Sequence, residues 1–244
     1  MKILQLLLEN KGKEGEFKVV QKGREATVYV YDVIGDDYYG GVSAKQFVSE
    51  IAALDVDVIK LRVNSPGGDV FAGVAMGQAL KDHSAKVIAY IDGQAASAAT
   101  RLTANADEVH IASGAFYMIH NSWTIAAGDN REFFKTANLL KDVDETIIAD
   151  YHAKTGQSVE QLQQWMNETT WFKAEDAVKY GFANSVTGNA TAEAKNRWNL
   201  AAYDNAPKEL INPDPEPNND INARATELRA TAERRLALLE RIAA

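Results

Sequence analysis

The sequence predicts an α/β protein in which strands alternate with helices and pair mostly in parallel. Three segments rich in β-branched and aromatic residues, 26–34, 58–63 and 86–91, have the composition of strands. Helical patterns separate them, because apolar residues recur every three or four positions after Ser43 and again over 70–80. Strands that alternate with helices form βαβ units, which bury a parallel sheet between helical layers.

The same alternation continues toward the C-terminus. A helix of small residues is predicted from Ala95, and short strands are predicted over 108–111 and 116–119. The longest helical stretch covers 131–154, which is too long to lie wholly over a small sheet, so we expect part of it to project. Ser158 begins a capping-box pattern for one more helix.

The composition excludes several functional classes. The 244 residues are 46% hydrophobic, which is enough for a full core and rules out a disordered chain. A net charge of −8 argues against nucleic acid or an anionic membrane as a partner, since both favour a basic face. The absence of cysteine excludes disulfides, thiolate metal ligands and cysteine nucleophiles, and it fits a cytoplasmic location. Charged residues interrupt every apolar run before it reaches the ~18–20 residues of a membrane helix, and Glu9 interrupts the N-terminal run too early for a signal peptide.

Proline marks the main boundary along the chain. Four of the five prolines lie within 207–217 and alternate with acidic residues, a pattern that favours extended, solvated backbone. We therefore predict a linker over 203–220, between a main domain over 25–202 and a C-terminal helix over 221–244. That last stretch is rich in helix-forming residues and either packs on a partner or stays half-formed. Residues 1–24 form a separate N-terminal segment, either a short strand or a packed arm.

Two glycine turns are candidates for a functional site. The segment Asn64–Gly68 (Asn-Ser-Pro-Gly-Gly) follows a strand and opens a helix, so its N–H groups can point at a phosphate or a developing oxyanion. Turns of this kind are also common as purely structural features. The segment matches neither the P-loop nor the dinucleotide-binding G-x-G-x-x-G pattern.

The second turn, Gly93–Ala99, places Ser97 among alanines, where a strand-to-helix turn could present its hydroxyl as a nucleophile. Ser97 could equally be a cap on a closely packed helix. His120 ends an apolar strand, where it is either a site residue or a satisfied strand-end histidine. An anion-binding turn, a serine on a turn and a histidine, in this order, together favour acyl-transfer chemistry.

Four ordered segments resemble the signature blocks of the ClpP serine peptidases. Three of them are Asn64–Gly68, Gly93–Ser97 and Met118–His120, and Phe172–Gly181 is similar to the family's A-x-E-A-x-x-Y-G segment. The resemblance covers about 25–186. It implies the ClpP/crotonase-like fold of repeated ββα units with a protruding handle helix.

The resemblance also implies a catalytic site. Ser97 would be the nucleophile and His120 its general base, and the backbone N–H groups of Gly68 and Ala98 would form the oxyanion hole. No metal or organic cofactor is implied.

The third triad member is where the sequence departs from the family. Where the family has an aspartate, this chain has Thr169, with Glu168 as the neighbouring alternative. A hydroxyl can orient the histidine ring but cannot balance its charge, so the identity of this member stays open.

Segments 31–35 and 168–172 look most like those of phage-encoded ClpP-like prohead proteases. The resemblance therefore implies a serine endopeptidase in stacked homo-oligomeric rings in the host cytoplasm, with capsid or scaffold proteins as substrates. The need for an ATPase unfoldase stays open. Two alternatives remain: a crotonase-type acyl-CoA enzyme, which shares the fold, and a catalytically decayed structural component that binds scaffold.

Overall fold

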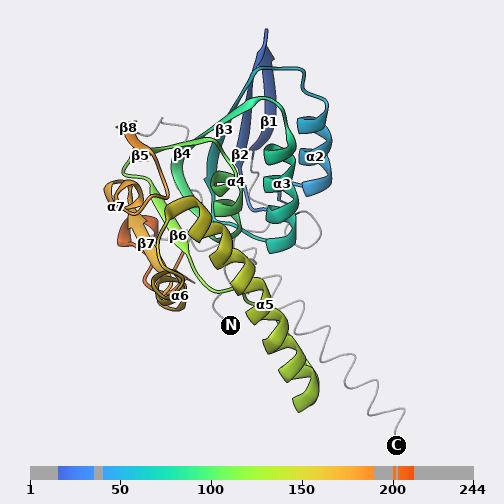
Figure 1. Ribbon diagram of the computed structural model, residues 1–244, viewed down its shortest axis with the longest axis vertical. Coiled ribbons are helices and arrows are strands. Elements are labelled where there is room, and N and C mark those ends of the chain that lie inside the picture. Colours follow the sequence, from blue (N-terminus) through green and yellow to red (C-terminus); the bar gives the residue numbers. More distant parts are fainter. Residues whose placement is uncertain (1–15, 36–40, 190–199, 202, 212–244) are drawn as a thin grey trace, which may run out of the picture.

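A sheet of eight strands runs through the molecule, and helices lie against it (Figure 1). The computed structural model describes residues 16–35, 41–189, 200–201 and 203–211. The main path of the sheet has the order β1-β2-β3-β4-β5-β8, while β6 pairs with β4, and β7 pairs with β6. The strands are β1 Glu16–Lys22, β2 Glu25–Tyr31, β3 Val58–Ser65, β4 Lys86–Ala96, β5 Glu108–Ser113, β6 Phe116–Ile119, β7 Thr170–Lys173 and β8 Ser185–Asn189.

The pairing is mostly parallel, as the alternating pattern predicts. Strands β2, β3, β4, β5 and β8 pair in parallel with one another in this order, and β6 pairs in parallel with β4. Only β1, on β2, and β7, on β6, pair antiparallel among the described strands. Alternate residues of the central strands are fully buried between the layers, among them Val28, Leu61 and Ala89. β1 lies within the N-terminal segment predicted over 1–24, and residues 1–15 of that segment lie outside the described part of the chain.

Strand β4 pairs with two different strands along its length, on the same side. Its first part pairs with β5 from Ile88 to Ile91, and its last part, Gln94–Ala96, pairs with β6. The sequence predicts a helix from Ala95, and this prediction is wrong, because the strand continues through Ala96 before the chain turns. Pairing with β6 therefore outweighs the high intrinsic helix propensity of alanine.

The helices begin at side-chain caps that the sequence indicates. The hydroxyl of Ser43 accepts a hydrogen bond from the N–H of Gln46, and that of Ser158 accepts one from Gln161. Helices α2, α3 and α4 contact one another in succession and form a layer against the sheet (Figure 1). The helices are α2 Ala44–Ala52, α3 Val70–Asp82, α4 Thr100–Ala104, α5 Asn130–Thr155, α6 Val159–Asn167 and α7 Ala174–Lys179.

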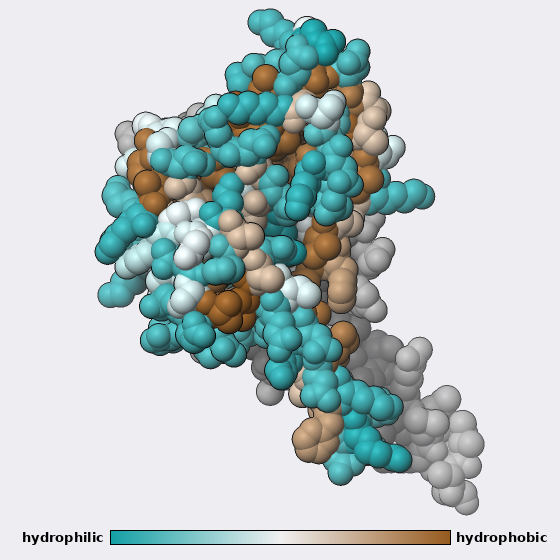
Figure 2. Space-filling model, viewed as in Figure 1, coloured by the Kyte–Doolittle hydropathy of each residue, from teal (hydrophilic) through white to brown (hydrophobic). Residues whose placement is uncertain are grey.

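The long helix α5 projects from the body of the molecule, as its length predicts (Figure 1). Its C-terminal half is anchored, since Ile147, Ile148 and Tyr151 are buried in the core. On its N-terminal half, Phe133 is 52% exposed and Phe134 is 69% exposed. Figure 2 shows hydrophobic side chains among hydrophilic ones on this projecting part.

Residues 203–211 differ from the solvated linker that the proline pattern predicts. Tyr203 and Leu210 are buried with Leu200 in a small second core, which also contains Ala96 and Met118. A short 3₁₀ helix, Lys208–Leu210, follows Pro207. Large apolar residues on both sides of Pro207 account for the difference, because Tyr203 and Leu210 find buried positions beside β4 and β6. The rest of the predicted linker and the predicted C-terminal helix lie outside the described residues.

Truncation should reveal this contribution to stability. We expect a chain that ends after residue 202 to unfold at a lower temperature than one that ends after residue 211. The shorter chain loses Tyr203 and Leu210, and burying each such side chain stabilises the fold by about 1.5–3 kcal/mol. Thermal unfolding of the two truncated chains, followed by circular dichroism, measures the difference. Equal melting temperatures would show that the segment contributes nothing to the core.

Candidate active site

Ser97 lies at a sharp turn between β4 and α4. A 3₁₀ turn, Ser97–Ala99, connects the two elements. The backbone of Ser97 has φ +53°, in the left-handed region that a residue other than glycine adopts at a cost of about 1–3 kcal/mol. Strain of this kind clusters at active sites, and a strand–turn–helix geometry presents the turn side chain at the end of the sheet.

The glycine turn of the segment Asn64–Gly68 lies directly beside this serine. A Cβ atom added to Gly67 would lie 2.7 Å from the Cβ of Ser97 and 2.6 Å from the carbonyl oxygen of Ala96. Gly67 also has φ +93°, which favours glycine. The close approach of the two turns therefore requires a residue without a side chain at this position.

The turn leaves the N–H of Gly68 available for a ligand. The carbonyl of Gly67 accepts a hydrogen bond from Ile34 N (2.8 Å), and Asp69 N donates one to Ile34 O (2.8 Å). Because successive peptide groups of an extended chain point to opposite sides, the N–H of Gly68 faces away from Ile34. Ala98 lies in the first turn after β4, where N–H groups have no acceptor within the helix. Both N–H groups that the resemblance assigns to an oxyanion hole therefore lie in these two adjacent turns.

His120 reaches Ser97 because of the register between β4 and β6. Ala96 pairs with Met118 in the parallel ladder, so the residues just past both strand ends lie side by side. The Nε2 atom of His120 lies 2.7 Å from the Oγ atom of Ser97. The two residues that the sequence analysis selects are therefore within hydrogen-bond distance, although 23 positions separate them along the chain.

Burial lowers the pKa of His120 to about 4. The imidazole is therefore neutral at pH 7, and its Nε2 can accept a proton from the hydroxyl of Ser97. The same burial disfavours the imidazolium that forms when the ring takes that proton. A site of this kind needs a group that orients or stabilises the ring, which a carboxylate does in Ser-His-Asp enzymes.

Thr169 and His120 lie just beyond the last printed pair of the antiparallel ladder between β6 and β7. That pair joins Ile119 to Thr170, so His120 follows the end of β6 and Thr169 precedes the start of β7 at the same end of the ladder. Thr169 has φ +51°, a strained backbone for a β-branched residue. The side chain of Glu168 is exposed and accepts a hydrogen bond from Gln164. Within the described chain, no hydrogen bond joins the ring of His120 to Thr169 or Glu168.

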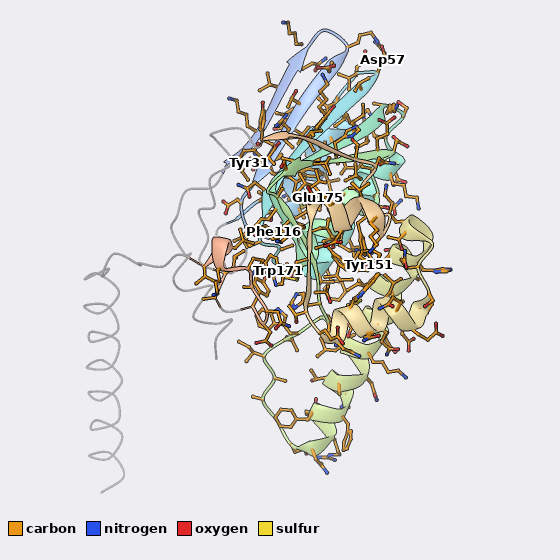
Figure 3. All side chains as sticks on the ribbon, turned by 90° about the vertical axis from the view of Figure 1, so that its left-hand side faces the viewer. Tyr31, Asp57, Phe116, Tyr151, Trp171 and Glu175 are labelled. Atoms are coloured by element: carbon orange, nitrogen blue, oxygen red, sulfur yellow. The ribbon has the colours of Figure 1, made fainter. Side chains whose placement is uncertain are left out.

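Residues of the predicted linker also reach the site, and the sequence analysis did not include them. The ring of Tyr203 packs edge to face on that of His120, with a centroid distance of 5.3 Å. Trp171 packs on Tyr203 at 6.1 Å and on Phe116 at 6.4 Å, at the edge of the sheet seen in Figure 3. The signal in the sequence is the presence of the large apolar residues Tyr203 and Leu210 on either side of Pro207, which a solvated linker does not need.

The other histidines have partners elsewhere. His83 contacts the carbonyl of Leu54, His110 contacts the hydroxyl of Ser185, and His152 contacts the carbonyl of Gln157. In the described ranges, no group of three or more acidic or histidine side chains is arranged to hold a metal ion. The same ranges contain no helix that is long and apolar enough to cross a membrane.

The site has the geometry of a serine-peptidase site on an α/β fold, and comparison with known proteins gives its family. The family model of the Clp protease matches residues 13–190, so the chain belongs to the Clp protease family. The comparison bears out the resemblance seen in the sequence signatures.

Curated relatives and a solved structure agree with this assignment. The ATP-dependent Clp protease proteolytic subunit 2 of Tropheryma whipplei (strain Twist) is 26% identical over 165 residues, covering 67% of this chain and 91% of the relative. The proteolytic subunit of Streptococcus suis (strain 98HAH33) is 28% identical over 161 residues, covering 60% of this chain and 79% of the relative. A ClpP1 mutant from Listeria monocytogenes has a TM-score of 0.58 and 23% identity, covering 80% of this chain and 99% of that chain. This likeness shows the ClpP-like fold.

Substitutions at Thr169 and Glu168 should identify the third member of the site. If the hydroxyl of Thr169 orients His120, Thr169→Val lowers the rate of peptide hydrolysis, whereas Glu168→Gln is nearly silent. Thr169→Asp then keeps or raises the rate, because a carboxylate also stabilises the imidazolium. Steady-state kinetics on a fluorogenic peptide measures all three variants. A severe loss in Glu168→Gln assigns the role to Glu168 instead. If Thr169→Val and Glu168→Gln both keep the wild-type rate of hydrolysis, neither residue is the third member.

Proposed function

We propose that this chain is a serine endopeptidase that cleaves peptide bonds through an acyl-enzyme on Ser97. The observation that carries the proposal is the 2.7 Å separation between Ser97 Oγ and His120 Nε2, on a strained turn beside Gly68. Membership in the Clp protease family supports the same chemistry. It favours a peptidase over a crotonase-type acyl-CoA enzyme and over a decayed structural component.

The proposed reaction uses side chains, backbone N–H groups and water. Ser97 Oγ attacks the carbonyl carbon of the scissile bond while His120 Nε2 takes the hydroxyl proton. The N–H groups of Gly68 and Ala98 stabilise the negative charge that develops on the carbonyl oxygen. The C–N bond then breaks, and the leaving amine takes the proton from His120.

Hydrolysis of the acyl-enzyme completes the cycle. A water molecule attacks the ester carbonyl while His120 takes a proton from it, and the ester bond to Ser97 breaks. The proton returns to Ser97, which restores both side chains. Because burial keeps His120 neutral well below pH 7, the base should be available across the physiological range.

The proposal extends to assembly and substrate. We expect a homo-oligomeric ring in which the exposed Phe133, Phe134 and Leu139 of α5 pack against another copy, because such an apolar surface is typical of an interface. Capsid or scaffold proteins are the proposed substrates, on the strength of the phage-like sequence segments. Light scattering tests the ring, and co-expression with capsid and scaffold proteins, followed by mass mapping of cleavage sites, tests the substrates.

A fluorophosphonate probe separates the proposed function from its alternatives. An active serine hydrolase forms a covalent adduct on its nucleophile. We expect tandem mass spectrometry to place the adduct on Ser97, and purified protein to degrade an unfolded substrate such as casein. An acyl-CoA enzyme or a decayed structural protein would leave Ser97 unmodified and casein intact.

A further inference from the structure

The segment formed by residues 200–201 and 203–211, called here the C-terminal strap, contacts His120, the glycine turn at Pro66 and the loop at Glu168. Tyr203 is its central contact, because its ring packs on His120 and its hydroxyl donates a buried hydrogen bond of 3.0 Å to the carbonyl of Pro66. Pro66 belongs to the glycine turn that carries Gly68. One side chain therefore links the histidine to the turn that presents the proposed oxyanion donor.

The strap also holds the loop that contains Glu168 and Thr169. The side-chain amide of Asn205 donates a hydrogen bond of 2.7 Å to the carbonyl of Glu168. The indole N–H of Trp171 donates one of 3.2 Å to the carbonyl of Asp204. In the first bond the strap supplies the donor, and in the second β7 supplies it. Together the two bonds fix the strap against the loop.

Two leucines anchor the strap at its ends. Leu200 and Leu210 are buried in the second core, and the N–H of Leu200 donates a hydrogen bond of 3.3 Å to the carbonyl of Leu210. The same core contains Ala96, which precedes Ser97, and Met118, which lies two residues before His120. Movement of the strap would therefore disturb both strand ends that carry the reacting side chains.

The position of Tyr203 matters because the ring of His120 has one hydrogen bond within the described chain. That bond joins Nε2 to Ser97, and no described residue bonds the other ring nitrogen. A second contact, made with the ring itself, adds to the orientation that this one hydrogen bond gives the imidazole. The edge-to-face contact with Tyr203, at an interplanar angle of 87°, supplies one.

We propose that Tyr203 is a positioning residue for His120, holding the imidazole so that Nε2 stays directed at Ser97. The strap fulfils part of the orienting role that a triad carboxylate has in other serine peptidases. This inference rests on the proposed function, because positioning matters only if His120 is the general base. It assigns a catalytic purpose to a segment outside the matched family region, which ends at residue 190.

The electrostatics of the pair agree with this role. Burial raises the pKa of the Tyr203 phenol far above its usual value, so the hydroxyl stays protonated and keeps donating to Pro66. Burial is also the cause of the low pKa of His120. Glu168 and Asp204, the acidic residues nearest in the adjoining loop and strap, are exposed. Removing the ring of Tyr203 should therefore expose the imidazole to water and raise its pKa toward the ordinary value near 6.5.

Two substitutions and a matched control test the proposal in the full chain. Tyr203→Ala removes the ring, and Tyr203→Phe removes only the hydroxyl. Tyr90→Ala is the control, because Tyr90 packs on His110 with a similar centroid distance of 5.2 Å, away from the site. Thermal unfolding of each variant shows that it is folded. The pH dependence of acylation by a p-nitrophenyl ester then reports the ionisation of the base.

We expect Tyr203→Ala to lower the acylation rate at pH 8 by on the order of 10- to 100-fold, the cost of a misplaced catalytic group. Its acidic midpoint should move up from about 4 toward about 6. Tyr203→Phe should keep the midpoint and lose less activity, and Tyr90→Ala should change neither quantity. An unchanged midpoint in a folded Tyr203→Ala variant overturns the proposal. A faster rate in that variant also overturns it and shows that the strap inhibits.

A second readout separates this inference from the proposed function. Titration of the His120 ring by NMR with labelled histidine, assigned with a His120→Gln variant, needs no turnover. If wild-type protein is not acylated at all, the proposed function fails. The ring titration still decides whether Tyr203 fixes His120, since a pKa that is the same with and without the Tyr203 ring contradicts the positioning role.

Discussion

Ser97→Ala should abolish peptide-bond cleavage while leaving the fold and the assembly intact. Removing the nucleophile of a serine-protease triad lowers kcat by on the order of 10⁶-fold, because no other group forms the acyl-enzyme. The substitution deletes one oxygen atom from a half-buried side chain. The hydrogen bond from Thr100 Oγ1 to the backbone carbonyl of Ser97 does not depend on that atom, so the turn should survive.

Casein degradation and peptide hydrolysis measure the loss, and light scattering measures the assembly. Ser113→Ala is the matched control, because Ser113 is exposed at the end of β5 and loses the same atom. The control should keep full activity. Retention of more than a few per cent of the activity in Ser97→Ala would remove Ser97 from the proposed mechanism.

Gly68→Ala should have the second largest effect, through the backbone rather than through any lost side chain. Gly68 has φ +149°, and an added Cβ would lie 2.0 Å from the carbonyl oxygen of Ile34. The turn must therefore shift, and its N–H moves away from the position where the oxyanion forms. Loss of one oxyanion donor lowers kcat by roughly 10²–10³-fold.

The same clash should lower stability, which the sequence alone does not indicate. From the sequence alone, Gly68 is assigned only the role of an oxyanion donor through its backbone N–H. In the structure the obstructing atom is backbone, so the strand end at Ile34 has to move with it. Acylation rates and melting temperatures measure both effects. Gly188→Ala is the control, since no atom lies within 4 Å of its added Cβ. Near-normal turnover in a folded Gly68→Ala variant would mean that the turn is purely structural.

Local patterns were sufficient to predict most of the fold. The β-branched runs that form β3 and the first part of β4 alternate buried and less buried residues, and Ser43 and Ser158 cap helices as expected. The end of β4 was predicted incorrectly, because Ala95 and Ala96 have helical propensity and become strand only through pairing with β6. A contact between distant segments cannot be derived from propensity.

The site could be predicted in part for a related reason. Ser97, His120 and Gly68 lie at strand ends and glycine turns, which leave marks in the sequence, and the structure brings them together. The contacts of Tyr203 and Asn205 could not be predicted, because large apolar residues beside Pro207 indicate that the segment packs on the domain but not where it docks. The positions of Tyr203 and Asn205 in the site are therefore determined by tertiary packing rather than by local sequence.

Trapping the acyl-enzyme tests the central claim most directly. The full chain is mixed with a p-nitrophenyl ester, quenched with acid within the first turnover and digested, and the peptides are mapped by tandem mass spectrometry. The account predicts one added acyl group on Ser97, absent from Ser97→Ala and strongly reduced in His120→Gln. An acyl group on another residue, or release of p-nitrophenol with no acylated peptide at any time, would contradict it.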